Sequence, residues 1–129
     1  MSGYSGTPLA KKLGIKPHSR LLLLRADPAF TIDDLPDGVS QQRRPGREPY
    51  ETILLFAADL SAATKGFAPA ARRLTTAGGL WVCWPKKSSG VQTDLTENDV
   101  RAIGLAAGLV DVKVCAVDDT WSGLRPRRP

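Results

Sequence analysis

Two lysines and two serines follow an apolar run in the stretch WPKKSSG. Lys86 and Lys87 carry point charges on flexible stems, which suit phosphate or carboxylate groups. Ser88, Ser89 and the backbone amides beside the next glycine could add hydrogen-bond donors. The stretch therefore predicts an anion-binding site. The same letters also fit a strand-to-helix loop whose lysines only keep an apolar strand end in solution.

Three further polar residues join this candidate site through a rule about open α/β sheets. Ligands in such sheets bind beyond the carboxyl ends of the strands, where the strand order reverses. In this chain the predicted strand ends read RADPAF, FAADLS and WPKKSSG. The rule therefore adds Arg25, Asp27 and Asp59 to the candidate ligand-binding residues.

Tryptophans stand close to two of the predicted strand ends. Alternation along LWVCW puts Trp81 and Cys83 on one face of a strand and Trp84 on the other. Trp81 is expected in the core. Trp84 and Trp121 are candidates to line a pocket or an interface, because an indole joins an apolar body to one hydrogen-bond donor.

Side chains typical of catalysis are sparse. Asp118 and Asp119 form an acidic pair that could serve acid–base chemistry, but the preference of aspartate for turns explains the pair more simply. His18 is the single histidine and is expected in a loop. No Ser/His/Asp arrangement can be built around it, so we predict no catalytic residue.

The two cysteines indicate packing rather than chemistry. Cys83 and Cys115 each lie in an apolar, strand-like run, where reduced thiols pack as small hydrophobic groups. The chain has no C-x-x-C pair, and with one histidine it offers no zinc-ligand set. We therefore predict no metal site.

Basic residues exceed acidic ones by 18 to 13, which gives a formal charge of +5. The excess lies in two arginine groups, Arg43, Arg44 and Arg47 in one and Arg125, Arg127 and Arg128 in the other. Such groups can bind nucleic-acid phosphates, but they equally fit a solvated loop and a flexible tail. Because no aromatic residues are interleaved with them, nucleic acid is not the favoured partner.

Length and composition bound the architecture. The 129 residues, 42% of them hydrophobic, are enough for one compact domain spanning 1–129. Within it, residues from about 124 to 129 are predicted to form a flexible basic tail. No apolar run approaches the roughly 18 residues that a membrane helix needs, and the N-terminus lacks the apolar core of a signal peptide. The expected location is the cytoplasm, with no membrane contact.

The first half of the chain predicts one short helix and three strands. The helix covers about residues 8–13, with Thr7 as its N-cap, Pro8 in its first position and Gly14 at its end. A buried strand follows in SRLLLLRA. An irregular connection then leads to a weak edge strand in VSQQRR and a buried strand in YETILLFA.

The middle of the chain predicts a long helix and a further buried strand. The helix is expected from Asp59, its cap, to Gly78 or Gly79. Because an interior proline kinks a helix, a bend or a division into two pieces is expected at Pro69. The strand is LWVCW.

The last part predicts a capped helix and a hairpin. Thr96 and Asp99 form a capping-box variant, and Gly108 ends the helix. Gly104, which lies inside it, indicates close packing on the sheet. The residues VDVKVCAVDDTWSGLRPRR predict two antiparallel strands, with Pro126 at or beyond the end of the second.

Strands that alternate with helices imply parallel pairing and right-handed crossovers. We therefore predict an α/β fold: a three-layer, Rossmann-like domain with a mostly parallel sheet of about six strands and a C-terminal antiparallel hairpin. The order of the segments LGIKPHSRLLLL, ETILLFA, TTAGGLWVCWPK and TENDVRAIGLAAGLVDVKVCAVDDTW resembles the class I methyltransferase fold.

A closer resemblance exists in two long segments, GYSGTPLAKKLGIK and WPKKSSGVQTDLTENDVRAIGLAAGLVDVKVCAVDDTWSGL. They are similar to the short bacterial proteins of the domain-of-unknown-function family 3052. This resemblance implies a bacterial protein. It brings no known activity and assigns no role to any residue.

The cofactor signature of methyltransferases is missing. The turn after the first strand reads LLLLRADPAF, which has no G-x-G, and Pro28 removes an amide donor. The second strand ends in arginines, although that position in methyltransferases is usually an acid that binds a ribose. We therefore predict no S-adenosylmethionine and no other cofactor.

These features favour a noncatalytic module that binds a protein partner, a second copy of itself or a small anionic ligand. Two alternatives stay open. The chain could be an enzyme acting on a phosphorylated or carboxylated small molecule, with Lys86 and Lys87 as clamps. It could also be a weak nucleic-acid binder that uses its arginine groups.

Overall fold

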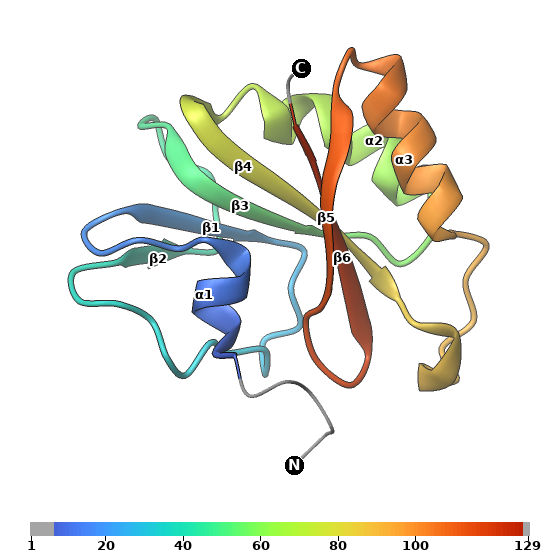
Figure 1. Ribbon diagram of the computed structural model, residues 1–129, viewed down its shortest axis with the longest axis horizontal. Coiled ribbons are helices and arrows are strands. Elements are labelled where there is room, and N and C mark those ends of the chain that lie inside the picture. The colour runs from blue at the N-terminus through green and yellow to red at the C-terminus, as the bar shows by residue number, and fades with distance from the viewer. Residues whose placement is uncertain (1–6, 128–129) are drawn as a thin grey trace.

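Six strands form one mixed sheet in the computed structural model, which describes residues 7–127 apart from the side chains at positions 111 and 112 (Figure 1). The strands are β1 (Arg20–Leu24), β2 (Ser40–Gln42), β3 (Tyr50–Phe56), β4 (Leu74–Pro85), β5 (Val110–Ala116) and β6 (Trp121–Arg127). Their order across the sheet is β2-β1-β3-β4-β6-β5. The first four run parallel, whereas β6 pairs antiparallel with β4 and β5. The predicted fold class is confirmed.

The strand order reverses at β1, which has β2 on one side and β3 on the other. The carboxyl ends of the parallel strands β1, β3 and β4 therefore meet at one edge of the sheet, which we call the carboxyl edge. Trp121, the first residue of β6, lies at this edge opposite Pro85. A reversal of this kind is where open α/β sheets bind their ligands.

Apolar runs form the central strands because both faces of the sheet are covered. Leu21, Leu22 and Leu23 of β1 are fully or almost fully buried, as are residues 53–56 of β3. The register aligns Leu22 with Ile53. Neither face of these strands meets solvent, so polar residues do not need to alternate with apolar ones. The sequence of each strand is therefore a continuous apolar run.

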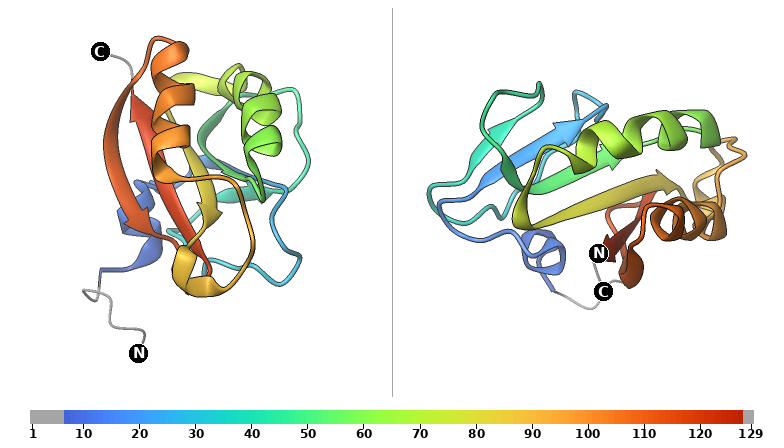
Figure 2. Two further views of the ribbon diagram at one scale, coloured as in Figure 1. Left: turned by 90° about the vertical axis from the view of Figure 1, so that its right-hand side faces the viewer. Right: turned by 90° about the horizontal axis from the view of Figure 1, so that it is seen from above.

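Helices cover the two faces unequally (Figure 2). On one face lie α2 (Leu60–Ala71) and α3 (Glu97–Ala106), and on the other lies the short α1 (Leu9–Leu13). Residues 25–39, which we call the covering loop, complete the α1 face. Its Phe30 and Ile32 pack in one core cluster with Trp81. Val100 of α3 belongs to the separate cluster on the other face.

Two of the three helix starts follow the predicted caps. The Asp59 carboxylate accepts a hydrogen bond from the Ala62 N–H at 2.8 Å. Thr96 and Asp99 form a complete capping box, and Gly108, with φ 82°, follows α3. These caps are local contacts, which a short stretch of sequence specifies by itself.

The cap of α1 was predicted wrongly. Pro8, not Thr7, is the N-cap residue, and it has no side chain that can accept a hydrogen bond. The Asp34 carboxylate of the covering loop accepts from the Ala10 N–H at 3.2 Å instead. The covering loop thus provides the hydrogen-bond acceptor that the residues next to the helix start lack. Gly14 ends the helix at φ 77° as predicted.

The helix predicted up to Gly78 or Gly79 is shorter than expected. α2 ends at Ala71 and runs unbroken through Pro69, which lies in its last turn. Gly78 and Gly79 lie inside β4. A Cβ atom at Gly79 would stand 2.5 Å from Nε of Arg125, so the glycine makes room for a neighbouring side chain instead of stopping a helix.

Residues 124–127 were predicted to start a flexible tail, but they belong to β6, where Leu124 has no exposed surface. Residues 128–129 lie outside the described part of the chain. Pro126 lies inside β6, one residue before its end, where the strand borders only β5. Its ring packs under Gly104, where an added Cβ would lie 2.9 Å from the Pro126 Cβ. This confirms the predicted close packing of α3.

The outer edge of the sheet is irregular. The pairing of β5 with β6 shifts in register between Asp111 and Lys113. β5 has one strand neighbour, so this shift lies in an edge strand. Among the described residues, no helix has the length and the apolar character needed to cross a bilayer.

Candidate anion-binding site

The polar residues predicted at the carboxyl edge differ in what they do there. Arg25 follows β1 directly, is exposed and has a φ of 59°, in the left-handed region. The Asp27 carboxylate accepts from the Ala29 N–H at 2.8 Å, which braces the covering loop. Asp59 caps α2. Both carboxylates therefore stabilise the backbone beside them.

Arg43 holds the covering loop in place. Its guanidinium donates to the Asp27 carbonyl at 3.2 Å and to the Phe30 carbonyl at 2.5 Å. Sequence reasoning placed Arg43 in a solvated basic group and missed this contact, because its partners lie 16 and 13 residues away. The contact fixes the loop across the ends of β1 and β3.

An aromatic row fills the carboxyl edge on the α1 face. Phe30 of the covering loop meets Phe56, the last residue of β3, with ring centroids 4.9 Å apart. Phe56 meets Trp121 at 5.1 Å, again edge to face. Trp121 is half-buried and packs against the core of this face. The row occupies the space above the reversal of strand order with the protein's own side chains.

Lys86 lies between two cavities of about 520 Å³ each. The first cavity is on the α1 face and is lined by α1, the covering loop and the β5–β6 turn. Besides Lys86 it carries Lys12 and four carboxylates, namely Asp33, Asp34, Asp118 and Asp119. The acids outnumber the lysines, so this cavity does not suit an anion.

The second cavity is on the α3 face of the sheet and contains both lysines of the WPKKSSG stretch. It is lined by Trp84, Pro85, Lys86, Lys87, Val91, Gln92, Thr93, Leu95, Thr96, Glu97 and Ser122. Arg25, Asp27, Ser88, Ser89, Asp59 and Trp121 line neither cavity. The structure thus brings Lys86, Lys87 and Trp84 together and leaves the other predicted residues apart.

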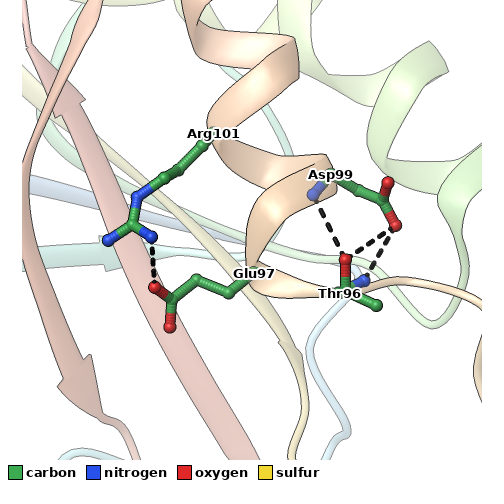
Figure 3. A network of polar contacts seen from close by, with 4 residues as sticks. All are labelled: Thr96, Glu97, Asp99 and Arg101. Atoms are coloured by element: carbon green, nitrogen blue, oxygen red, sulfur yellow. Dashed lines mark hydrogen bonds and ion pairs between the residues drawn. The ribbon is translucent and has the colours of Figure 1, made fainter.

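The charge of the second cavity is positive. Glu97 is the acidic residue among the described residues that line it, and its carboxylate pairs with Arg101 at 2.6 Å (Figure 3). Asp99, two residues along the helix, does not line the cavity and is engaged in the capping box with Thr96. Because the Glu97 carboxylate already has a cationic partner in Arg101, no unpaired acid that lines the cavity offsets the charges of Lys86 and Lys87.

The loop that forms one wall of this cavity is held by its own hydrogen bonds. The short 3₁₀ turn η1 (Lys87–Ser89) is closed by Ser89, whose hydroxyl donates to the Lys86 carbonyl at 2.6 Å and accepts from the Val91 N–H at 3.2 Å. Asp94 accepts from the Leu60 N–H at 2.8 Å, which ties the loop to α2. Ser89 therefore shapes the loop and does not contact the cavity.

Sequence reasoning missed most of the polar lining of the second cavity. Gln92 and Thr93 lie in the loop before α3 and belong to no recognisable motif. Ser122 lies in β6, far from the lysines in sequence. Val91 gave the one available signal, an apolar residue amid polar letters. It is 48% exposed.

The cysteines are free thiols on the α1 face. Cys83 of β4 and Cys115 of β5 both align with Gly123 of β6, which lies between them. Two strand spacings of about 4.8 Å separate them too far for a disulfide. Burial raises the pKa of Cys83 well above its ordinary value, and Cys115 and Asp118 add to this. Burial also raises the pKa of Cys115, against the opposing effect of Lys12 and Lys113.

Cys83 is buried as predicted, whereas Cys115 is only half-buried. Within residues 7–127, no group of three or more His, Cys, Asp or Glu side chains could hold a metal ion.

Comparison with known proteins supports the fold and goes no further. No protein-family model matches the sequence, and no curated protein matches it either. The resemblance to family 3052 therefore stays an interpretation of the sequence.

Solved structures do match. A candidate methyltransferase from Thermoplasma acidophilum superposes with a TM-score of 0.50 at 8% identity, over 88% of this chain and 70% of that one. The magnesium protoporphyrin IX methyltransferase from Synechocystis PCC 6803, solved with bound SAH, gives a TM-score of 0.46 at 15% identity, over 78% and 54%. This chain has a methyltransferase-like α/β fold. At such identity the first likeness shows the fold alone.

Proposed function

We propose that this protein is a noncatalytic module of methyltransferase-like fold that binds a small anionic ligand in the second cavity. One observation carries the proposal. Lys86 and Lys87 line the same cavity, and its acidic residue, Glu97, is already paired with Arg101. Lys86 is half-buried and Lys87 is exposed. Two such point charges in one cavity attract phosphate or carboxylate groups, and the attraction grows where the ligand excludes water.

The position of the covering loop supports our proposal that no nucleoside cofactor binds at the end of β1. Where methyltransferases have a glycine-rich turn, this chain has Arg25 in a left-handed conformation and Phe30 packed on Phe56. Phe30 is held by the Arg43 contact to its carbonyl. A nucleoside could enter this place only if the covering loop moved away and Phe30 left the core.

The noncatalytic part of the proposal is supported by the hydrogen bonds of the predicted acids. The carboxylates of Asp27 and Asp59 accept backbone N–H groups. Asp118 accepts from the N–H groups of Thr120 and Trp121 at 2.8 and 2.7 Å, as expected for a turn. These carboxylates hold the backbone beside them, a structural role that accounts for their positions without acid–base chemistry.

The test is calorimetry of the full chain with inorganic phosphate, pyrophosphate, citrate, nucleotides and S-adenosylmethionine. At least one small anion is expected to bind, more weakly as salt is added. Lys86→Ala with Lys87→Ala is expected to weaken that binding at least tenfold, since hydrogen bonds to charged groups contribute about 1.5–3 kcal/mol each. Thermal unfolding should change little.

A matched control is Lys16→Ala with Lys65→Ala. Both residues are exposed and line neither cavity. Their replacement removes the same charge as the replacement of Lys86 and Lys87. If this control weakens binding as much as the first pair does, only net charge matters and the site is wrong. Turnover of any bound compound, or S-adenosylmethionine seated over Arg25 and Asp27 in a soaked crystal, would refute the noncatalytic assignment.

The nucleic-acid alternative has less support. Arg43 is engaged by the covering loop. Arg125 is half-buried against the backbone of Gly79. Each basic group thus has a member with a structural contact, which leaves fewer arginines free to reach phosphates.

A further inference from the structure

We infer that the ligand of the second cavity is an organic anion with an apolar body, and not a bare oxyanion. This inference rests on the proposed anion binding by Lys86 and Lys87. It adds the chemistry of the rest of the ligand: an aromatic or branched aliphatic group, attached to a phosphate or carboxylate, that lies against Trp84, Pro85 and Val91 and offers a hydrogen-bond acceptor to the Trp84 indole.

The size of the cavity is the first argument. Its volume of about 520 Å³ falls within the range of about 300–1,000 Å³ typical of sites for organic ligands. A phosphate or acetate ion has only a few heavy atoms and would fill a small part of it. The lysines account for part of the lining, and the remaining volume can hold a larger body.

Part of the lining is apolar, beside the polar Gln92, Thr93, Thr96 and Ser122. Trp84, Pro85 and Leu95 are buried residues of this lining. Val91 also lines the cavity and is 48% exposed. Of the exposed large hydrophobic residues in the described chain, Val91 lines a cavity, whereas Leu105, Val110 and Val114 line neither. The apolar side chains of this lining offer contact to an apolar part of a ligand.

The indole nitrogen of Trp84 is the second, independent sign of a ligand. Trp81, in the other core, donates its indole N–H to the Leu13 carbonyl at 3.0 Å. Trp84 as a whole residue is 7% exposed, yet its indole N–H has no hydrogen bond among the described residues. Every fully buried side-chain nitrogen or oxygen there has a partner, so the Trp84 nitrogen retains accessible surface.

An indole nitrogen can only donate. The cavity that Trp84 lines is the second one. We place the Trp84 N–H at this cavity, because Trp84 does not line the other one. There it can donate to an oxygen of the ligand, either in the link between head and body or in the head itself.

The wall around this space is formed before any ligand arrives. Ser89 fixes the turn that leads to Val91. Thr93 accepts from the Leu95 N–H at 3.1 Å, and Asp94 ties the loop to the start of α2. A site that needs no ordering keeps more of its contact energy as affinity. The expected gain from an apolar body is thus measurable.

The test compares matched probes by calorimetry with the full chain: inorganic phosphate against phenyl phosphate, and acetate against phenylacetate. The two pairs distinguish a phosphate head from a carboxylate head. In at least one pair the aromatic member is expected to bind at least tenfold more tightly than the bare ion. Phenol, which has the body without the charge, is expected to bind more weakly than the aromatic anion.

Two variants locate the apolar contact. Val91→Ser is expected to weaken binding of the aromatic anion about fivefold and to leave the bare ion unchanged. Trp84→Phe, which keeps an aromatic ring and removes the N–H, is expected to weaken it about three- to tenfold. Val114→Ser is the control, because Val114 is 45% exposed and lines neither cavity. It is expected to change nothing.

The outcomes separate the two proposals. If each bare ion binds as tightly as its aromatic partner, or if Val91→Ser has no effect, the inference about the ligand body is wrong and the anion site stands. If no anion binds, or if Lys86→Ala with Lys87→Ala leaves binding unchanged, the anion site itself is wrong and the inference fails with it. Should Trp84→Phe not fold, the probe pairs and Val91→Ser still decide.

Discussion

Arg25 shows at the scale of one residue how this chain departs from a cofactor-binding turn. Its φ of 59° lies in the left-handed region, directly after β1. Glycine adopts this conformation without steric cost, whereas an L-residue loses about 1–2 kcal/mol in it. The backbone thus bends as a glycine turn would, but a long cationic side chain extends from the bend.

Two substitutions at this position separate the backbone from the side chain. Arg25→Gly and Arg25→Ala both remove the guanidinium, but only glycine relieves the strain. We expect Arg25→Gly to be more stable than Arg25→Ala by about 1 kcal/mol, measured by urea unfolding. Equal stabilities would show that the left-handed conformation at Arg25 carries no cost.

The Cys83 thiol provides a pH-dependent prediction. Its pKa is raised in the folded protein, chiefly by burial. Above the ordinary thiol range of about 8.5, the unfolded chain releases this proton before the folded chain does. The free energy of unfolding should therefore fall as pH rises past that range, and this loss should be smaller in Cys83→Ala.

The measurement is urea unfolding between pH 7 and 10 for both proteins. Other groups titrate over this range, so the difference between the two slopes is the informative quantity. A thiol reagent at pH 8 should modify half-buried Cys115 in the native state and Cys83 only after unfolding. Rapid native-state modification of Cys83 would contradict its burial.

Residue-level prediction succeeded where contacts are local. Asp59, Thr96 and Asp99 act within three residues of themselves, so their cap roles could be predicted from the sequence. The contacts of Arg43 and Asp34 join segments 13 to 24 residues apart. The residues next to Arg43 and Asp34 in the sequence do not specify such contacts.

At the scale of elements, buried strands could be predicted because apolar runs in parallel sheets are continuous. The boundary between α2 and β4 could not. The residues before Gly78 and Gly79 were interpreted as a helix that ends at a glycine. In the structure Leu74 already belongs to β4 and pairs with Tyr50 of β3. Pairing with β3 overrides local preference, and Gly79 makes room for Arg125.

Two helical glycines make a matched test of packing. An added Cβ at Gly104 would lie 2.9 Å from Pro126, part of a rigid strand, whereas at Gly66 it would meet the flexible Leu55 methyl groups at 3.1 Å. Alanine improves helix propensity by about 1 kcal/mol at either position, but overpacking costs about 1–3 kcal/mol.

We expect Gly104→Ala to lower the free energy of unfolding and Gly66→Ala to be close to neutral, both measured by urea unfolding. A stabilised Gly104→Ala protein would mean that α3 can move away from β6 without loss.

At the scale of the whole molecule, β6 joins two parts of the sheet. It lies between β4 and β5, and β5 has no other strand neighbour among the described strands. A chain ending at Gly123 should therefore lose cooperative unfolding in circular dichroism. Leu124→Ala is a graded control, expected to cost about 2–5 kcal/mol, because Leu124 is fully buried. A truncated chain that unfolds at the midpoint of the full chain would restore the tail hypothesis.

The site could be predicted only in part, because its position depends on the whole sheet. The rule on strand ends nominated Lys86 and Lys87, which follow β4 directly and line one cavity; their binding of an anion stays a prediction. The rule could not tell which side chains would join Lys86 in the cavity on each face of the sheet, since that depends on the paths of the covering loop and of the loop before α3. Val91 and Ser122 join the lysines only because a loop and β6 converge there.

The register shift in β5 bears on how these molecules behave when crowded. A strand from a neighbour can extend a sheet only by matching evenly spaced N–H and C=O groups along a free edge. Between Asp111 and Lys113 that spacing is broken, so a neighbour could stay in step along only one half of β5 at a time. The β5 edge should therefore resist the addition of a neighbour's strand, which leaves β2, the other edge strand, as the border where a sheet could extend.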